Sequence, residues 1–226
     1  MIRDRAKRLV QALVRRRTAV RFDDLARTEP VARGFGWDRG TPIDRAYIAQ
    51  FVAAHRDRLV GRVLEIGEAR YAPRFAPGAL STTVLHVEPG NGLVGDLANT
   101  ATLPAAAFDA VICTQVLGVI YDVAAAVAGL EHVLAPGGCA LVTVSGIAQL
   151  SRFDAARWGD YWRFTEASLR RLFERFDVVA VESRGNVATA VALLQGVAVE
   201  DLPDPQVLAT HDREYPVTLG VVAVKR

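Results

Sequence analysis

Several features that would define a protein class are scarce or missing in this chain of 226 residues. It has two cysteines, Cys113 and Cys139, and each lies in an apolar, strand-like run, which favours reduced core residues over a disulfide. None of its four histidines pairs with another at the spacing of metal ligands, so we expect no metal site. Neither a Gly-x-Ser-x-Gly elbow nor a phosphate-binding loop is present, so the sequence signals of a serine hydrolase and of a P-loop NTPase are missing.

Long apolar runs and a strong net charge are missing as well. No stretch approaches the ~18 consecutive apolar residues of a membrane span. The first fifteen residues alternate charged and apolar positions, unlike a secretory signal, so we expect a cytoplasmic protein without a membrane span. The formal net charge is only +2, which argues against nucleic acid as a partner.

The charge that is present is unevenly distributed. Residues 1–60 hold 14 Lys and Arg against 7 Asp and Glu, a net +7, whereas the remainder holds 13 against 18, a net −5. The basic residues gather in a segment that reads as one amphipathic helix over residues 2–17. Two interpretations stay open for it: a solvated helix that packs its apolar stripe, or a surface that docks a partner.

The chain does contain the alternation of strands and helices that an α/β domain requires, and 51% of its residues are hydrophobic, enough for one core. Residues 22–40 read as loop. Thr41 to Asp44 predict the start of a helix that reaches about residue 59, with Thr41 as its cap. Further strands are predicted at 63–66, 84–87, 109–114, 139–145, 177–183 and 216–224, and further helices at 121–134, 166–175 and 187–199. We expect an N-terminal helix and a cleft-covering loop in residues 1–40, and one α/β domain in residues 41–226.

The most informative motif is VLEIG at residues 63–67, a buried strand that ends in an acid and a glycine. A second strand ends about twenty residues later at Glu88, where nucleotide-binding α/β sheets carry the acid that takes the ribose hydroxyls. GDL at 95–97, FDAVI at 108–112 and LAPGG at 134–138 follow in order. Over roughly residues 40 to 226, this series resembles the class I S-adenosylmethionine-dependent methyltransferases of type 11.

The resemblance implies a doubly wound, mostly parallel Rossmann-like methyltransferase sheet with S-adenosylmethionine as its cofactor. It implies that Glu65 and Gly67 contact the methionine portion of the cofactor and that Glu88 accepts the ribose hydroxyls. It also implies that Asp96 and Leu97 contact the adenine. Near the sulfonium, the implied contacts are Thr114, Gln115 and Val116. The last three follow a predicted strand, and open α/β sheets bind ligands beyond the carboxyl ends of their strands.

The front half departs from the family pattern in two ways. The turn after the first strand holds one glycine, Gly67, where relatives carry three, and Tyr71 can cover the resulting gap. The first crossovers are also abbreviated. Residues 68–81 contain two prolines, and only five residues separate Glu88 from Val94, whereas a helical crossover needs at least ~10–12. We therefore predict no helix between the second and third strands, and a third strand that is vestigial or absent.

Candidate substrate contacts lie in two aromatic segments. WGDYWRFT at 158–165 follows the fifth strand on the side where the cleft opens, and an aromatic, Arg-bearing lid suits a sugar, an aromatic or a phosphate-bearing ligand. The alternative is that Trp162 and Phe164 staple the next helix, capped by Thr165, to the core. The second segment is the glycine-rich loop before the first helix of the domain. The expected substrate residues are Trp37, Trp158, Tyr161, Trp162 and Arg163.

The catalytic base is poorly specified, and Tyr121, Asp122 and His211 are its candidates. The function we expect is S-adenosylmethionine-dependent O-methylation of a small molecule, a sugar or a glycosylated metabolite. The single glycine motivates an alternative in which methyl transfer is lost, leaving a binding or scaffold protein or a non-methylating enzyme. The expected partners are a small-molecule substrate and, through the basic helix, a homodimer copy or a partner enzyme.

Overall fold

A computed structural model describes residues 27–90 and 92–226 of the chain. The predicted helix at residues 2–17 lies outside the described residues. Val31–Arg226 forms one compact unit that contains the whole sheet, and the loop at residues 31–40 belongs to this unit. No helix among the described residues is both long and apolar enough to cross a membrane.

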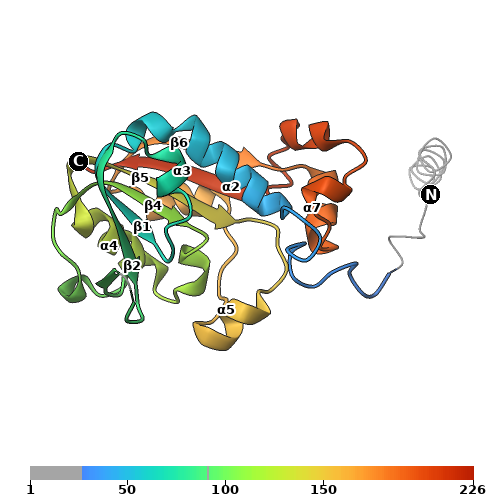
Figure 1. Cartoon of the computed structure of the whole chain (residues 1–226), viewed down its shortest axis with the longest axis horizontal. Helices are drawn as coiled ribbons and strands as arrows, with labels where there is room; N and C mark the ends of the chain where they lie inside the picture. Colours follow the sequence, from blue (N-terminus) through green and yellow to red (C-terminus); the bar gives the residue numbers. More distant parts are fainter. Residues whose placement is uncertain (1–26, 91) are drawn as a thin grey trace, which may run out of the picture. The chain divides into compact units, whose positions relative to one another are not determined.

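Seven strands form one sheet in the order β3-β2-β1-β4-β5-β7-β6 (Figure 1). The first five strands in the chain run parallel, and β7 is antiparallel to both of its neighbours. Their bounds are β1 Gly61–Ile66, β2 Ala79–His86, β3 Leu93–Val94, β4 Phe108–Thr114, β5 Leu134–Ser145, β6 Asp177–Arg184 and β7 Thr218–Val224. The strand order reverses between β1 and β4, and at such a switch point the carboxyl ends of the strands leave a crevice. The predicted fold class is confirmed.

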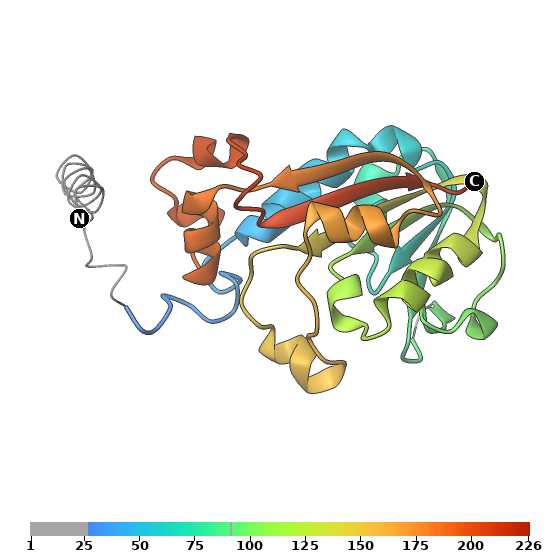
Figure 2. The same ribbon diagram turned by 180° about the vertical axis from the view of Figure 1, so that it is seen from behind.

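Helices cover both faces of the sheet. One face packs on α2 (Ile43–Ala54) and the four-residue α3 (Ala72–Phe75), and the other on α4 (Val123–Val133) and α6 (Glu166–Leu172), which lie in front of the sheet in Figure 2. The remaining helices are α5 (Arg152–Arg157) and α7 (Val187–Leu194), and 3₁₀ turns lie at Arg56–Arg58, Thr100–Thr102, Leu117–Val119, Val199–Asp201 and Pro205–Ala209. Thr165 caps α6 in a capping box with Ser168, as predicted.

The helix α2 begins differently from the sequence prediction. Its N-cap is Pro42, and no side chain caps it. The Thr41 hydroxyl instead donates to Glu200 Oε1 over 2.7 Å. This threonine therefore fastens residues 31–40, which we call the front loop, to the 3₁₀ turn at Val199–Asp201. The apolar face of α2 is as expected, because Ile48, Phe51 and Val52 are fully buried. Gly220 in β7 lies directly beneath the Phe51 ring, where a Cβ atom would approach Cε2 to 2.4 Å.

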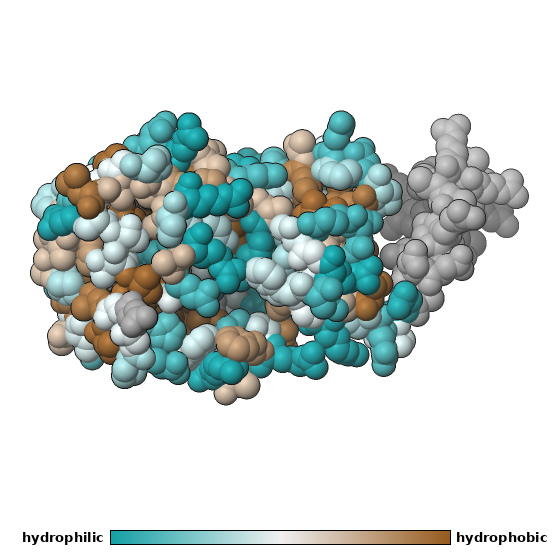
Figure 3. All heavy atoms as spheres, in the orientation of Figure 1, coloured by the Kyte–Doolittle hydropathy of each residue, from teal (hydrophilic) through white to brown (hydrophobic). Residues whose placement is uncertain are grey.

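The abbreviated crossovers are present as predicted. Only α3 follows β1, no helix joins β2 to β3, and β3 has two residues. Because β3 pairs only with Leu85 and His86, the earlier part of the outer β2 edge has no strand partner among the described residues. Leu80, Val87 and Val94 are exposed there, and apolar groups are visible over this region at the left of Figure 3.

Candidate functional site

A cavity of about 590 Å³ opens where the parallel strands end. Its floor comes from the ends of β1, β4 and β5, and its walls come from the front loop, the start of α2 and the segment that carries α5. Nine residues expected from the sequence line it: Trp37, Glu65, Gly67, Thr114, Gln115, Val116, Trp158, Trp162 and Arg163. The cavity thus brings together residues from seven separate parts of the chain, because His86 at the end of β2 lines it as well.

A second cavity of about 240 Å³ lies beside the connection from β2 to β3. Gly67 and His86 line both cavities, so the two are neighbours, and Glu88 lines the second. The backbone N–H of Glu88 donates to His86 Nδ1 over 2.9 Å. This bond requires an unprotonated Nδ1, so the neutral imidazole carries its proton on Nε2.

Glu65 organises the turn that follows β1. Its side chain is buried, and its carboxylate accepts the backbone N–H groups of Arg70 (3.0 Å), Tyr71 (2.8 Å) and Ala72 (2.8 Å). Burial raises the pKa of Glu65, and the three backbone hydrogen bonds oppose that shift. The carboxylate therefore ties the turn and the start of α3 to the end of β1.

The end of β4 has an unusual backbone. Gln115 adopts a left-handed conformation with φ of 59°, which is uncommon for a residue other than glycine and clusters at ligand sites. Its N–H donates to Thr143 O (2.8 Å), and the Ser145 hydroxyl donates to Gln115 Oε1 (2.8 Å). The end of β5 thus binds both the backbone N–H and the side-chain oxygen of Gln115 at the cavity floor, and Gln115 Nε2 has no hydrogen-bond partner among the described residues.

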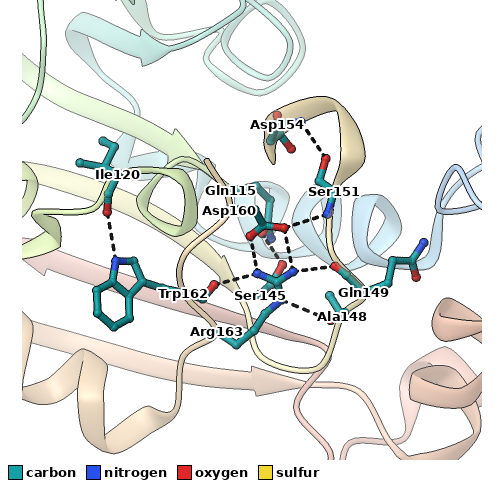
Figure 4. Close-up of polar contacts among 10 residues, drawn as sticks. All are labelled: Gln115, Ile120, Ser145, Ala148, Gln149, Ser151, Asp154, Asp160, Trp162 and Arg163. Atoms are coloured by element: carbon teal, nitrogen blue, oxygen red, sulfur yellow. Dashed lines mark hydrogen bonds and ion pairs between the residues drawn. The ribbon is translucent and has the colours of Figure 1, made fainter. Parts of the chain in front are cut away.

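Residues 148–163, which we call the lid, are closed at their base by Arg163 (Figure 4). Its guanidinium donates to both carboxylate oxygens of Asp160 (2.6 and 3.0 Å) and to the carbonyls of Ala148 and Gln149. Asp160 Oδ2 also accepts the Ser151 N–H over 2.7 Å. Hydrogen bonds from Arg163 lower the pKa of Asp160, although partial burial opposes the shift. Arg163 lines the cavity, but its hydrogen-bonding groups are engaged in this clasp.

The aromatic residues of the lid segment have two roles. Trp158 meets His86 edge to face, with ring centroids 6.0 Å apart, so the lid reaches the residue shared by both cavities. Trp162 is fixed by an Nε1–H bond to the carbonyl of Ile120 (Figure 4) and another to that of Tyr121, each 3.2 Å long. Phe164 is buried in the core. The segment therefore both lines the cavity and anchors α6.

The front loop is fastened by hydrogen bonds to the 3₁₀ turn at Val199–Asp201. Arg39 forms a bidentate pair with Asp201 (2.6 and 2.9 Å), and Thr41 binds Glu200 through its N–H and its hydroxyl. These bonds hold Trp37 between two guanidiniums, with Arg45 5.8 Å and Arg70 5.3 Å from its ring centroid. Trp37 is thus a fixed part of the cavity wall.

Three residues expected at the cofactor line neither cavity. Leu97 is a core residue, because it packs with α4 beneath the sheet. Asp96 is exposed, and its Oδ1 accepts the Ala98 N–H in a local turn. Tyr71 is buried and stacks on Phe75, so it supports the turn from below.

Four residues expected at the substrate or as the base also lie outside both cavities. Tyr121 is 72% exposed and packs on Tyr161 at the outer rim, with centroids 5.3 Å apart. Asp122 is the N-cap of α4 and accepts the Ala125 N–H. His211 packs edge to face on Tyr47, and burial lowers its pKa. None of the three candidate bases faces the cavity floor.

Sequence reasoning missed several lining residues. Asp44 and Arg45 line the larger cavity, yet in the sequence they read as the charged first turn of a helix. His86 reads as the interior of a strand, and Asp160 as one polar residue within an aromatic run. The available signal was the cluster of charged residues around Trp37. Because Asp44 and Arg45 also suit the first turn of a helix, their place at the cavity was not recognised.

Comparisons with known proteins match part of the sequence to one family model and the fold to several solved structures. Residues 70–142 match the family model described as a methyltransferase domain. No curated protein matches the sequence. The structure is similar to the N-methyltransferase NodS from Bradyrhizobium japonicum with bound S-adenosyl-L-homocysteine (19% identity, 87% of this chain and 94% of that chain, TM-score 0.52).

Two further similar structures differ in chemistry. One is a Burkholderia thailandensis 1,6-didemethyltoxoflavin-N1-methyltransferase (17% identity, 84% of this chain and 80% of that chain, TM-score 0.53). The other is the [4+2]-cyclase SpnF (18% identity, 89% of each chain, TM-score 0.53). At such identities the likeness is one of fold, and a fold does not fix the reaction.

Proposed function

We propose that this chain, which has the class I methyltransferase fold and a methyltransferase-domain segment at residues 70–142, is an S-adenosylmethionine-dependent methyltransferase of a small molecule. The observation that supports this most is the pair of neighbouring cavities at the switch point, joined through Gly67 and His86. Glu88 lies where a ribose is bound in sheets of this kind. The larger cavity then has room for the methionine portion and for an acceptor.

The residues present fit this cofactor chemically. The acid of Glu88 suits two ribose hydroxyls, and the charged side chains at the start of α2 suit an amino-acid group. When bound, S-adenosylmethionine supplies an activated methyl group. The chain's own task is to align the acceptor and exclude water, and alignment alone can contribute ~7–11 kcal/mol.

For the acceptor we propose a hydroxyl of a sugar or a glycosylated metabolite. Trp37, Trp158 and Trp162 give the larger cavity aromatic walls, and polar groups lie between them. With the sequence-predicted bases outside the cavity, deprotonation would fall to Asp154. This lid carboxylate lines the cavity, and its side chain has no hydrogen-bond partner among the described residues.

A second candidate is a reaction without methyl transfer. The side chains at the ends of β4 and β5 that line the cavity, Thr114, Gln115, Val116 and Ser145, include no group that takes a proton near neutral pH. A hydroxyl placed above them has no base on the cavity floor and depends on the lid carboxylate of Asp154. A cyclisation or isomerisation in the same cavity would not need one at this position.

Calorimetric titration of the full chain with S-adenosylmethionine and S-adenosylhomocysteine tests the proposal. Micromolar binding followed by acceptor-dependent formation of S-adenosylhomocysteine would support methyl transfer. Binding without any methyl consumption across sugar and glycoside acceptors would favour the second candidate. Absence of binding up to millimolar ligand would refute cofactor use.

Replacing Glu88 with alanine should weaken S-adenosylhomocysteine binding by about 1–3 kcal/mol, the scale of losing a charged hydrogen-bond partner. The effect follows from its place on the smaller cavity. Titration calorimetry measures it, with Glu174→Ala, an exposed acid at the end of α6, as the matched control. Unchanged affinity in Glu88→Ala would remove this residue from the cofactor site.

Replacing Trp162 with alanine should reduce kcat for the acceptor more than it reduces cofactor affinity. The ring lines the cavity and is fixed by two carbonyls, so its loss removes a rigid wall. Steady-state kinetics and calorimetry together separate the two effects. Tyr215→Ala is the control, because both side chains belong to residues that are 38% exposed. A larger loss of cofactor affinity than of turnover would place Trp162 against the cofactor.

A further inference from the structure

The start of α2 places an adjacent carboxylate and guanidinium on the wall of the larger cavity, and each has a buried polar atom without a hydrogen-bond partner among the described residues. Asp44 is 8% exposed, and its Oδ1 has no hydrogen-bond partner among the described residues. Nε of Arg45 is likewise buried and has no hydrogen-bond partner among the described residues. The two side chains are adjacent, with Asp44 Oδ2 3.6 Å from Arg45 Nε, and both line the cavity.

Folding alone does not explain these groups. A buried carboxylate oxygen without a partner is destabilising, and native proteins rarely keep one. Helix capping does not require Asp44, because the N-cap is Pro42 and no side-chain cap bond is made. A ligand group in the cavity that donates hydrogen bonds to the Asp44 carboxylate and accepts them from the Arg45 guanidinium would supply the pair with polar partners that the described chain does not give it.

The turn after β1 explains why side chains are needed here. Backbone N–H groups at the start of a helix commonly bind an anionic ligand group. In this chain those of Arg70, Tyr71 and Ala72 are already engaged by the Glu65 carboxylate. These amides are therefore not free for a ligand carboxylate, and the turn has a single glycine to bring other backbone close.

The neighbouring groups define the ligand chemistry. A carboxylate beside a guanidinium complements a zwitterion, with an ammonium group on Asp44 and a carboxylate on Arg45. The guanidiniums of Arg45 and Arg70 also lie 5.8 and 5.3 Å from the Trp37 ring centroid, so the ring adds a cation–π contact beside the pair. The pair also lines the same cavity as Gly67, which was expected to lie beneath the methionine portion of the cofactor.

We propose that Asp44 and Arg45 bind the α-ammonium and α-carboxylate groups of the cofactor's amino-acid end. Recognition of this end is thereby moved from a glycine-rich turn to the first turn of α2. The proposal rests on the proposed function and goes beyond it by assigning two residues that sequence reasoning placed in a helix cap.

Calorimetry on the full chain tests the assignment with three probes: S-adenosylhomocysteine, its decarboxylated analogue, and 5′-methylthioadenosine, which lacks the amino-acid end. Asp44→Asn and Arg45→Gln should each weaken S-adenosylhomocysteine binding by about 10- to 100-fold. Both should leave 5′-methylthioadenosine binding unchanged, and Arg45→Gln should not weaken the decarboxylated analogue. Asp57→Asn and Arg56→Gln, exposed neighbours beyond the end of α2, are the matched controls.

The melting temperature of the ligand-free chain separates binding from folding. Asp44→Asn removes a buried charge but also the counter-ion of Arg45, so the two effects oppose each other and this temperature should change by no more than about 2–3 °C, whereas a structural role predicts a larger fall. S-adenosylhomocysteine affinity within twofold of the wild type in both variants would overturn the assignment, as would equal losses for S-adenosylhomocysteine and 5′-methylthioadenosine. A wild-type chain that does not bind S-adenosylhomocysteine would instead refute the proposed function itself.

Discussion

Replacing Glu65 with alanine should lower the melting temperature of the chain by roughly 10 °C and abolish measurable cofactor binding. The carboxylate accepts three backbone N–H groups in a buried position, so its removal leaves three donors without partners. Breaking such a buried charged network costs about 3–5 kcal/mol. In a domain of this size each kcal/mol corresponds to about 2–4 °C.

Thermal unfolding followed by circular dichroism measures the effect. Glu65→Gln keeps one carbonyl oxygen and should lose about half as much. Glu68→Ala is the control for stability alone, because that acid lines the larger cavity; its side chain is 74% exposed and pairs only with Arg70 among the described residues. A melting temperature for Glu65→Ala within 2–3 °C of the wild type would mean that the turn does not depend on Glu65.

Replacing Arg163 with alanine should lower kcat/KM for the acceptor by at least about 100-fold, because a displacement of about 1 Å in the residues that position a substrate can reduce the rate by this factor. The change removes the hydrogen bonds that close the lid and leaves the Asp160 side chain, only 5% exposed, without its counter-ion. The lid should then open and expose residues 148–163 to proteases. Cofactor affinity should fall less, since the residues of the clasp line the larger cavity and not the smaller one.

Steady-state kinetics and limited proteolysis of the variant test this, with Arg171→Ala as a control that breaks an exposed ion pair. Arg163→Lys retains the charge but not the planar fork and should recover little of the loss. Normal kcat/KM with an intact lid would show that Asp160 and the two carbonyls do not need Arg163.

The same clasp predicts a pH dependence. Hydrogen bonds from Arg163 lower the pKa of Asp160 in the folded chain, so the carboxylate is favoured by folding. Its contribution is present above the unfolded pKa of ~3.9 and is lost as pH falls through the lower folded value. Lid proteolysis should therefore stay slow at neutral pH and begin to rise only below about pH 4.

Much of the architecture could be predicted from the sequence. The acid and glycine after β1, the acid after β2 and the two-residue β3 follow from strand patterns and from the lengths of the segments between them. Local rules are reliable here, because a crossover of five residues has no room for a helix. The capping box of Thr165 was predictable for the same reason.

The site was harder to predict where one residue type serves two purposes. Asp44 fits the first turn of any helix, and only the packing shows that it is buried in a cavity wall. Arg163 suggested a substrate contact, although carbonyls fourteen and fifteen residues earlier in the chain engage its guanidinium. Leu97 follows the family spacing, yet the contact of its backbone with Gly129 in α4 places it in the core.

The lid contains its own fastening. Ser151, Asp160 and Arg163, together with the two carbonyls that Arg163 binds, all lie within residues 148–163. Insertions or exchanges between Ser151 and Asp160 therefore leave β5 and α6 undisturbed, since loops closed at their base tolerate changes in length. The lining of the larger cavity can therefore vary in this segment while the ends of β1, β4 and β5 stay constant. For protein engineering, this makes the stretch from Arg152 to Gly159, with Asp154 and Trp158 retained, the place to reshape the larger cavity.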